Sequence, residues 1–182
     1  MASQNTTKNN TIHSSKSAGW GSRQRGAMTD KPAVLFDVDG TLVDSNYVHV
    51  FAWARAFASE RMPVQAWRIH RGIGMDGAAL IQSLTGGVDD DVAERLQARH
   101  SDFYREATVL LAPTPGAREL LHAVHELGLR VVLASSAPDD ELTILRKVLA
   151  CDDVVSAVTS SRDVETAKPE PAIVDIALTR AG

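Results

Sequence analysis

Two aspartates, Asp37 and Asp39, stand where an apolar segment of the sequence ends. The segment AVLFDVDGTLVDS, residues 33–45, places them two positions apart, with Gly40 directly after the second. Where a strand ends and its side chains stop alternating between faces, both carboxylates come near one point, and their repulsion is costly without a cation. Mg²⁺ prefers oxygen ligands and binds one or two carboxylates together with a phosphate. The pair therefore favours chemistry on a phosphate substrate.

The same residues have a second interpretation. Asp-Gly between apolar residues, as in VDGTLV, is also typical of a tight β-hairpin turn. A hairpin would pair two antiparallel strands on either side of Gly40 and would need no chemistry from the acids. Two acids at the end of a buried strand favour the metal site over the hairpin.

Two further segments place polar side chains at comparable positions. The apolar run LRVVLAS ends at Ser135, whose hydroxyl there could hold a phosphate oxygen. Lys168 lies in TAKPEP, where the following proline favours extended backbone in a loop before a helix. Small residues after a strand are usually turn formers, and a lysine in a loop is usually solvated. Their order along the chain is what favours a phosphate site: acids follow the first strand, a hydroxyl follows the second and a lysine follows the third.

Nearly continuous apolar runs predict the strands that position these residues, because such runs are typical of strands buried on both faces in a parallel sheet. The runs are residues 33–38, 129–135 and 154–160. Helical spacing predicts two helices, at residues 114–128 and 138–151. Their apolar faces are Leu120, Leu121, Val124 and Leu127 in the first, and Leu142, Leu145, Val148 and Leu149 in the second. The alternation of strands and helices predicts an α/β fold with a parallel sheet.

The stretch from residue 46 to residue 113 has a wholly helical pattern and is predicted to be an inserted helical domain. Trp53, Phe57 and Trp67 are expected to form its core. The insertion follows the first strand, so it would stand over the edge of the sheet where open α/β sheets bind ligands.

Composition restricts the classes of function. The chain has a formal net charge of -4, so it lacks the basic surplus that attracts nucleic acid or an anionic membrane, and we expect neither partner. The single cysteine, Cys151, cannot form an internal disulfide, which suits the reducing cytoplasm and predicts a cytoplasmic location. Residues 1–30 are rich in Ser, Asn, Thr and Gly and are predicted to be a disordered N-terminal extension.

DVDGT at Asp37–Thr41, the strand-terminal Ser135 and Lys168 in AKPEP together resemble the haloacid dehalogenase-like hydrolases. Within that family the resemblance is to the helical-cap branch, which includes phosphoglycolate phosphatase-like and beta-phosphoglucomutase-like proteins, and it covers about residues 33–182. It implies Mg²⁺-dependent phosphoryl transfer on a Rossmann-like core with an inserted α-helical cap. The implied parts are residues 31–45 and 114–182 for the core and 46–113 for the cap.

The resemblance also implies a role for each matching residue. Asp37 would be the nucleophile that forms an aspartyl-phosphate. Asp39 would be the general acid and base that protonates the leaving alcohol and then activates water. The Asp37 carboxylate and the Asp39 backbone carbonyl would hold Mg²⁺, and Ser135, Lys168 and Thr41 would contact the phosphoryl group. Family members that cleave carbon–halogen bonds do not use an acid at the position of Asp39, so dehalogenation is disfavoured.

One departure concerns the last part of the family pattern. The pattern continues with a fourth strand whose acids complete the magnesium site, whereas this sequence stops at Gly182. We therefore expect the chain to be C-terminally truncated, with the last core strands missing. Because the missing strand would lie beside the first one, its loss is expected to expose a strand edge that favours aggregation.

Three functional hypotheses follow. The first is a Mg²⁺-dependent phosphatase acting on a small soluble phosphomonoester, such as phosphoglycolate or a sugar phosphate. The second is a phosphosugar mutase of the same fold, and the third is a noncatalytic protein that lost the metal site. In the cap loop HRGIGMDG, Arg71 would meet a second charged group of the substrate, with a plain helix-breaking turn as the alternative.

Overall fold

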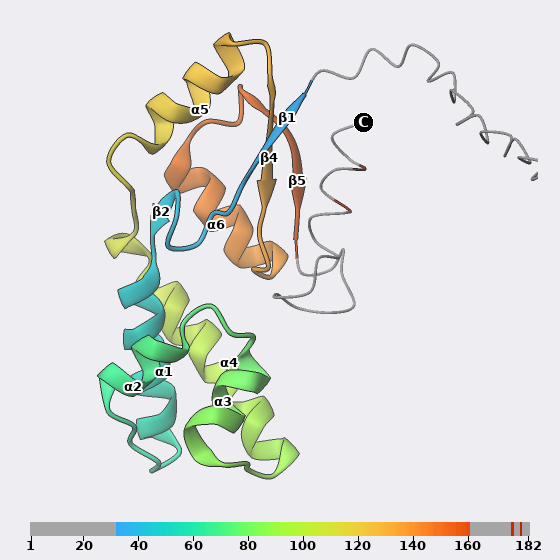
Figure 1. Cartoon of the computed structure of the whole chain (residues 1–182). Coiled ribbons are helices and arrows are strands. Elements are labelled where there is room, and N and C mark those ends of the chain that lie inside the picture. Colours follow the sequence, from blue (N-terminus) through green and yellow to red (C-terminus); the bar gives the residue numbers. More distant parts are fainter. Residues whose placement is uncertain (1–31, 161–175, 177–178, 180–182) are drawn as a thin grey trace, which may run out of the picture.

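The structure is a computed structural model that describes residues 32–160, together with residues 176 and 179. Its main sheet is parallel and has the strand order β1-β4-β5. The strands are β1 (Ala33–Phe36), β4 (Arg130–Ala134) and β5 (Val155–Thr159) (Figure 1). The three predicted strands and the parallel sheet are therefore confirmed. Residues 1–31, Lys168 and nearly all of the chain after residue 160 lie outside the described residues.

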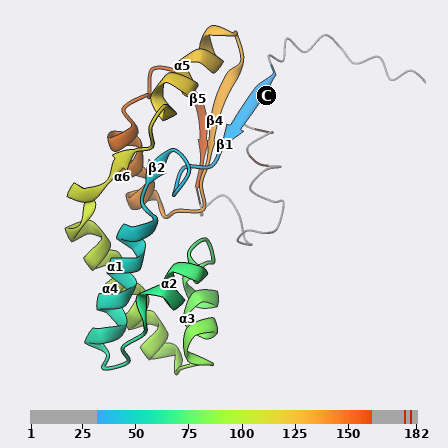
Figure 2. The ribbon, with the colours of Figure 1, turned by 60° about the vertical axis from the view of Figure 1, so that its left-hand side comes forward.

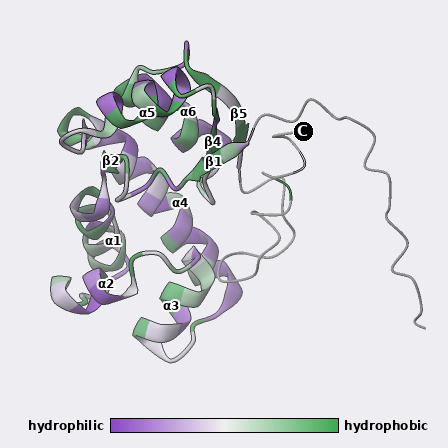
Figure 3. Cartoon of the chain, turned by 45° about the horizontal axis from the view of Figure 1, so that its top comes forward, coloured by the Kyte–Doolittle hydropathy of each residue, from purple (hydrophilic) through white to green (hydrophobic). Residues whose placement is uncertain are grey.

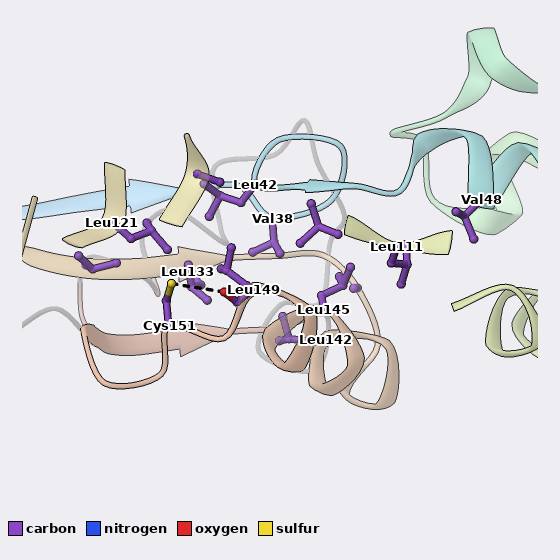
Figure 4. Close-up of a cluster of buried hydrophobic side chains, with 14 of the residues drawn as sticks. Val38, Leu42, Val48, Leu111, Leu121, Leu133, Leu142, Leu145, Leu149 and Cys151 are labelled. Atoms are coloured by element: carbon purple, nitrogen blue, oxygen red, sulfur yellow. Dashed lines mark hydrogen bonds between the residues drawn. The ribbon is translucent and has the colours of Figure 1, made fainter. Parts of the chain in front are cut away.

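Two helices, α5 (Ala117–Glu126) and α6 (Asp139–Leu149), cover one face of this sheet (Figure 1). Alternate residues of β4 point to opposite faces. Val131 and Leu133 join the cluster formed with α5 and α6, whereas Val132 and Ala134 lie on the other face. Figure 4 shows how the first cluster is filled. Its labelled residues are Val38, Leu42, Val48, Leu111, Leu121, Leu133, Leu142, Leu145, Leu149 and Cys151.

The predicted apolar face of α5 is partly wrong. Leu121 and Val124 are buried, but Leu120 is 47% exposed and Leu127 is 75% exposed. The buried face instead begins at Ala117, four residues before Leu121. Leu120 precedes that face by one residue, which turns it away by about 100°, and Leu127 lies beyond the last residue of the helix.

Helices follow one another between the short strands β2 (Val43–Asp44) and β3 (Ala112–Pro113), which pair antiparallel. The helices are α1 (Asn46–Ser59), α2 (Ala66–Gly72), α3 (Gly77–Thr85) and α4 (Asp90–Glu106), followed by the short helix η1 (Thr108–Leu110). We call α1–α4 the inserted helices. They lie to one side of the sheet, beyond β2 (Figures 1 and 2). The segment is helical as predicted except at β3, and the domain boundaries stay a prediction.

The inserted helices have a hydrophobic core of their own. It consists of Val50, Trp53, Ala56, Phe57, Ile69, Leu80, Ile81 and Leu96. Local sequence signals define the helices: the Asp76 carboxylate accepts hydrogen bonds from the N–H groups of Ala78 and Ala79, which caps the start of α3. Trp53 and Phe57 are in this core as predicted, whereas Trp67 is 62% exposed, so its predicted place in the core is wrong.

The helix α4 is amphipathic with a narrow apolar face, and most of its surface is hydrophilic (purple in Figure 3). Its buried residues are Leu96, His100 and Tyr104, which follow one another at a spacing of four positions. A spacing of four residues places them on one side of the helix, which packs against α1. No helix in the described residues has the length and apolar character needed to span a membrane.

Candidate active site

The two aspartates lie in a tight turn that directly follows β1. The carbonyl oxygen of Val38 accepts hydrogen bonds from backbone N–H groups further along the turn. The donors are Thr41 at 3.2 Å, Leu42 at 3.0 Å and Val43 at 3.0 Å. Gly40 has a φ of +66°, and a Cβ atom there would collide with the Asn46 side chain, so the turn requires glycine. The hairpin interpretation is wrong, because β2 pairs with β3 and not with β1.

Asp37 is half-buried and is the first residue after β1. The hydroxyl of Thr41 donates a hydrogen bond to Asp37 Oδ2 at 2.8 Å. The turn thus brings Thr41 back to the aspartate that precedes it by four residues. This bond orients the carboxylate from the exposed side of the turn.

Asp39 is held from the start of α1. Its Oδ1 atom accepts a hydrogen bond from the Ser45 hydroxyl at 2.7 Å and lies 3.2 Å from His49 Nε2. Ser45 is fully buried, and its oxygen also accepts the Gly40 N–H at 2.9 Å. Sequence reasoning missed Ser45 and His49. The signal was their spacing of four residues: Ser45 directly precedes α1, and His49 follows one turn later on the same side.

Behind His49 lies a cluster of rings that sequence reasoning also missed. His49 Nδ1 is 3.1 Å from His100 Nε2, and the two residues are 51 positions apart in the sequence. Trp53 stacks on His100 with ring centroids 4.3 Å apart, and Tyr104 stacks on His49 at 4.4 Å. Burial lowers the pKa of His100 to about 3, with the neighbouring His49 as the second cause. His100 is therefore a neutral ring at ordinary pH.

The hydroxyl of Tyr104 is buried, and no residue in the described part of the chain forms a hydrogen bond with it. An unsatisfied buried polar group costs about 1–3 kcal/mol. Burial also raises the pKa of Tyr104, and the charges of Asp39 and Glu141 raise it further. The phenol therefore stays protonated, and its ring serves mainly as a stacking surface for His49.

Replacing Tyr104 with Phe is expected to raise the free energy of unfolding by about 1 kcal/mol, because it removes the unsatisfied hydroxyl and keeps the ring. Urea denaturation of the two proteins measures this difference. As a control, Tyr47→Phe removes a hydroxyl from a side chain that is 70% exposed and should leave stability unchanged. A clear loss of stability in Tyr104→Phe would show that the hydroxyl has a partner, such as a buried water.

Glu141, in the first turn of α6, is 5% exposed. Burial raises its pKa to about 7, with His49 and Arg105 acting against the shift and Asp39 and Asp140 adding to it. The helix α6 therefore places a carboxyl group, largely protonated below neutral pH, near the Asp39 end of the site. Sequence reasoning did not single out Glu141.

Replacing Glu141 with Gln is expected to change how stability depends on pH. The folded state raises the pKa of Glu141 from 4.5 to about 7, so it binds the proton more tightly than the unfolded state does. Stability from this group is present below about pH 4.5 and is lost as the pH rises to about 7, about 3 kcal/mol in all. The glutamine side chain does not titrate. Between about pH 5 and 8, the free energy of unfolding of the variant, measured by urea denaturation, should therefore rise relative to that of the wild type. Glu126→Gln, at an exposed position of α5, is the control, and parallel pH profiles of Glu141→Gln and wild type would contradict this expectation.

Ser135 lies at the matching end of the neighbouring strand. The parallel register pairs Phe36 of β1 with Leu133 of β4, so Asp37 and Ser135 follow at the carboxyl ends of adjacent strands. Ser135 is 1% exposed, and its oxygen accepts the Ala137 N–H at 3.1 Å. That bond uses the serine as an acceptor, so its own proton can be donated to a ligand.

Two predicted site residues remain, Arg71 and Lys168. No contact in the described part of the chain joins Arg71 to the edge of the sheet where Asp37 and Ser135 lie. Arg71 is exposed in the last turn of α2, whose His70 stacks on Tyr47. Lys168 lies outside the described residues. Among the described residues, no group of three or more His, Cys, Asp or Glu side chains is arranged to hold a metal ion. Within the described turn, the side-chain carboxylates are those of Asp37 and Asp39.

Comparison with known proteins places this site in a family. The model of the haloacid dehalogenase-like hydrolases matches residues 31–182. The chain belongs to this family. A crystal structure of a hydrolase from Pseudomonas syringae, with the same fold, is 36% identical with a TM-score of 0.76, and the match covers 82% of this chain and 70% of that one.

Among curated relatives, a phosphoglycolate phosphatase of Pseudomonas putida is 27% identical over 156 residues, which are 82% of this chain and 57% of that protein. A phosphorylated carbohydrates phosphatase of Thermotoga maritima is 27% identical over 150 residues, 81% of this chain and 69% of that one. A crystal structure of a putative beta-phosphoglucomutase from Thermotoga maritima is 25% identical with a TM-score of 0.58, and the match covers 82% of this chain and 70% of that one. This haloacid dehalogenase-like chain thus spans little more than half the length of the phosphoglycolate phosphatase.

Proposed function

We propose that this haloacid dehalogenase-like protein is a Mg²⁺-dependent phosphatase that hydrolyses a small phosphomonoester through an aspartyl-phosphate. The observation that carries the proposal is the turn after β1, where Asp37 and Asp39 lie two residues apart and a separate set of donors holds each one. Two carboxylates in different surroundings suit two different roles. The phosphatase names of the curated relatives support the same reaction class.

In the first step an Asp37 carboxylate oxygen attacks phosphorus, and the bond from phosphorus to the ester oxygen breaks. The electron pair of that bond stays on the ester oxygen, which takes a proton from the Asp39 carboxyl group and leaves as the alcohol. In the second step Asp39 accepts a proton from water as the water attacks phosphorus. The bond from phosphorus to the Asp37 oxygen breaks, its electron pair returns to the carboxylate, and inorganic phosphate leaves.

The hydrogen bonds in the turn fit these roles. Thr41 fixes one oxygen of the nucleophile, which limits its rotation before attack. Ser45 and His49 both reach Oδ1 of Asp39 and so hold the acid in one orientation. Ser135 is proposed to donate to an oxygen of the phosphoryl group from the next strand, and Lys168 is proposed to reduce its charge.

Mg²⁺ would be held by the Asp37 carboxylate and the Asp39 backbone carbonyl. The donor set fits the ion in kind, because Mg²⁺ favours oxygen ligands and completes its shell with waters and substrate phosphate. When bound, the ion would neutralise charge on the phosphoryl oxygens. Asp37 would then meet less repulsion from the substrate as it attacks.

The inserted helices are proposed to act as a cap that closes over the substrate and excludes bulk water. The position of β2 and β3 supports this, since both connections to the inserted helices leave from the part of the core next to the aspartates. Arg71 of α2 is proposed to meet a second charged group of the substrate.

A small phosphate ester and a single buried cysteine agree with a cytoplasmic location.

A mutase of the same fold is the second candidate, and the likeness to the putative beta-phosphoglucomutase favours it. A mutase returns the phosphoryl group from Asp37 to a sugar before water removes it. The two candidates therefore differ in the acceptor of the second step and share the first.

The deciding experiment measures phosphate release from a panel of phosphomonoesters, with Mg²⁺ and with EDTA. The panel contains phosphoglycolate, several sugar phosphates and an aryl phosphate, and the proteins are the 182-residue chain and the longest chain that its reading frame encodes. Mg²⁺-dependent release in either chain supports the phosphatase. Isomerisation of a sugar phosphate without net release supports the mutase, and a folded protein that does neither overturns both.

A further inference from the structure

We propose that Thr114 is a positioning residue for Asp37. Thr114 is the first residue after β3, where the chain returns from the inserted helices, and it lies 73 positions after Thr41. Its hydroxyl binds the Thr41 carbonyl group, and through the Thr41 backbone it keeps the Thr41 hydroxyl on the Asp37 carboxylate. The proposal rests on the proposed role of Asp37 as nucleophile, and it adds to that role a residue from a distant part of the chain.

The hydroxyl of Thr114 has one proton and two carbonyl oxygens nearby. Thr114 Oγ1 lies 2.8 Å from the Thr41 oxygen and 3.4 Å from the Leu42 oxygen. Hydrogen bonds between two oxygen atoms are usually about 2.5–3.0 Å long, so the proton is donated to the Thr41 carbonyl. The Leu42 carbonyl has another donor, because it accepts the backbone N–H of Thr114 at 3.0 Å.

Two consecutive peptide groups of the turn are therefore held at both ends. In the first, Thr114 binds the Thr41 carbonyl, and the Leu42 N–H donates to the Val38 carbonyl at 3.0 Å. In the second, Thr114 binds the Leu42 carbonyl, and the Val43 N–H donates to the Val38 carbonyl at 3.0 Å. The antiparallel pairing of β2 with β3 brings Thr114 to this place. The return connection and the turn thus form one hydrogen-bonded unit.

The peptide group after Thr41 matters for Asp37 because its orientation sets the ψ angle of Thr41. Once the backbone is fixed, a branched threonine side chain has few χ1 positions, and the one adopted here brings its hydroxyl to 2.8 Å from Asp37 Oδ2. Thr41 is exposed, and its N–H makes the longest of the three bonds to the Val38 carbonyl, at 3.2 Å. The bond from Thr114 therefore adds a restraint at the least firmly held residue of the turn.

The restraint can be measured without any activity. In the ¹⁵N-labelled 182-residue chain, amide hydrogen exchange reports how often the turn opens. Thr114→Val keeps the branched shape and the backbone N–H, and it removes only the hydroxyl. We expect the Leu42 and Val43 amides to exchange about fivefold faster in this variant, whereas the Val132 amide of β4 should exchange as in the wild type. Unchanged exchange at Leu42 and Val43 in the folded variant would overturn the proposal.

The positioning role is tested by a double-mutant cycle in the proposed phosphatase. With an aryl phosphate as the probe, kcat/KM covers formation of the aspartyl-phosphate and so depends on how Asp37 is oriented. We expect Thr114→Val to lower kcat/KM about fivefold in the otherwise unchanged protein. In a protein that already carries Thr41→Val the same change should cost less than about 1.5-fold, because the hydroxyl through which Thr114 acts is gone. Equal losses in the two backgrounds would show that Thr114 does not act through Thr41, which contradicts the role.

Two further variants complete the test. Thr114→Ser keeps the hydroxyl and should recover most of the lost kcat/KM. Thr108→Val is the matched control, because the Thr108 hydroxyl also donates to a backbone carbonyl, that of Arg105 at 3.0 Å, and its removal should leave kcat/KM unchanged. No rescue by Thr114→Ser in a folded protein, or an equal loss in Thr108→Val, would indicate a purely structural residue and exclude the role. If the wild type hydrolyses no ester, the proposed function fails and the positioning role fails with it, while the exchange rates still report whether Thr114 restrains the turn.

Discussion

Replacing Asp37 with Asn is expected to lower the rate of Mg²⁺-dependent phosphate release by about 10⁴-fold or more, because the amide cannot form the aspartyl-phosphate. The Asn side chain has nearly the same shape, and its oxygen can still accept the hydrogen bond from Thr41. Stability should therefore change little, which separates a chemical loss from unfolding. The rates are measured with the most active ester of the panel.

Asp89→Asn is the matched control for this variant. Asp89 is exposed at the start of α4 and makes no capping hydrogen bond with its side chain, so the rate should stay within about twofold of wild type. If Asp37→Asn retained a tenth of the wild-type rate, Asp37 would not be the nucleophile. A direct attack by water would then be the better mechanism.

Replacing Asp39 with Asn is expected to lower kcat/KM by about 10²- to 10⁴-fold for an alkyl phosphate and by less for an aryl phosphate. Asn cannot transfer the proton, but its side-chain oxygen can still accept from Ser45 and His49. The fold and the orientation of the side chain should therefore persist. The measurement is the dependence of kcat/KM on the pKa of the leaving alcohol.

The same variant should expose the intermediate. With an aryl phosphate the first step needs little acid, whereas the second step still needs a base to activate water. The aspartyl-phosphate should therefore accumulate in Asp39→Asn and appear as one added phosphoryl group in the mass of acid-quenched protein. Its absence from this variant, together with equal losses for alkyl and aryl esters, would contradict the assignment of Asp39 as acid and base.

The sequence by itself predicted the parallel sheet correctly. The runs that became β1, β4 and β5 are apolar throughout because both faces of a parallel strand are covered, and this pattern is local. The closeness of the two aspartates is also local, because they flank Val38 directly after the strand, whereas the shape of the turn, with a positive φ at Gly40, came from the structure. The roles of Asp37, Asp39, Thr41 and Ser135 came from the same motifs and remain proposals.

Only the tertiary structure decided what surrounds Asp39. The contact between His49 and His100 joins residues 51 positions apart, and it depends on how α1 packs against α4. The burial of Glu141 and the exposure of Trp67 depend in the same way on which helix face meets a neighbour. Helical spacing shows that residues share a face, but not which face is covered, because coverage is a property of the partner element. The sequence therefore determined the site's carboxylates, and the packing of distant helices determined the environment that holds them.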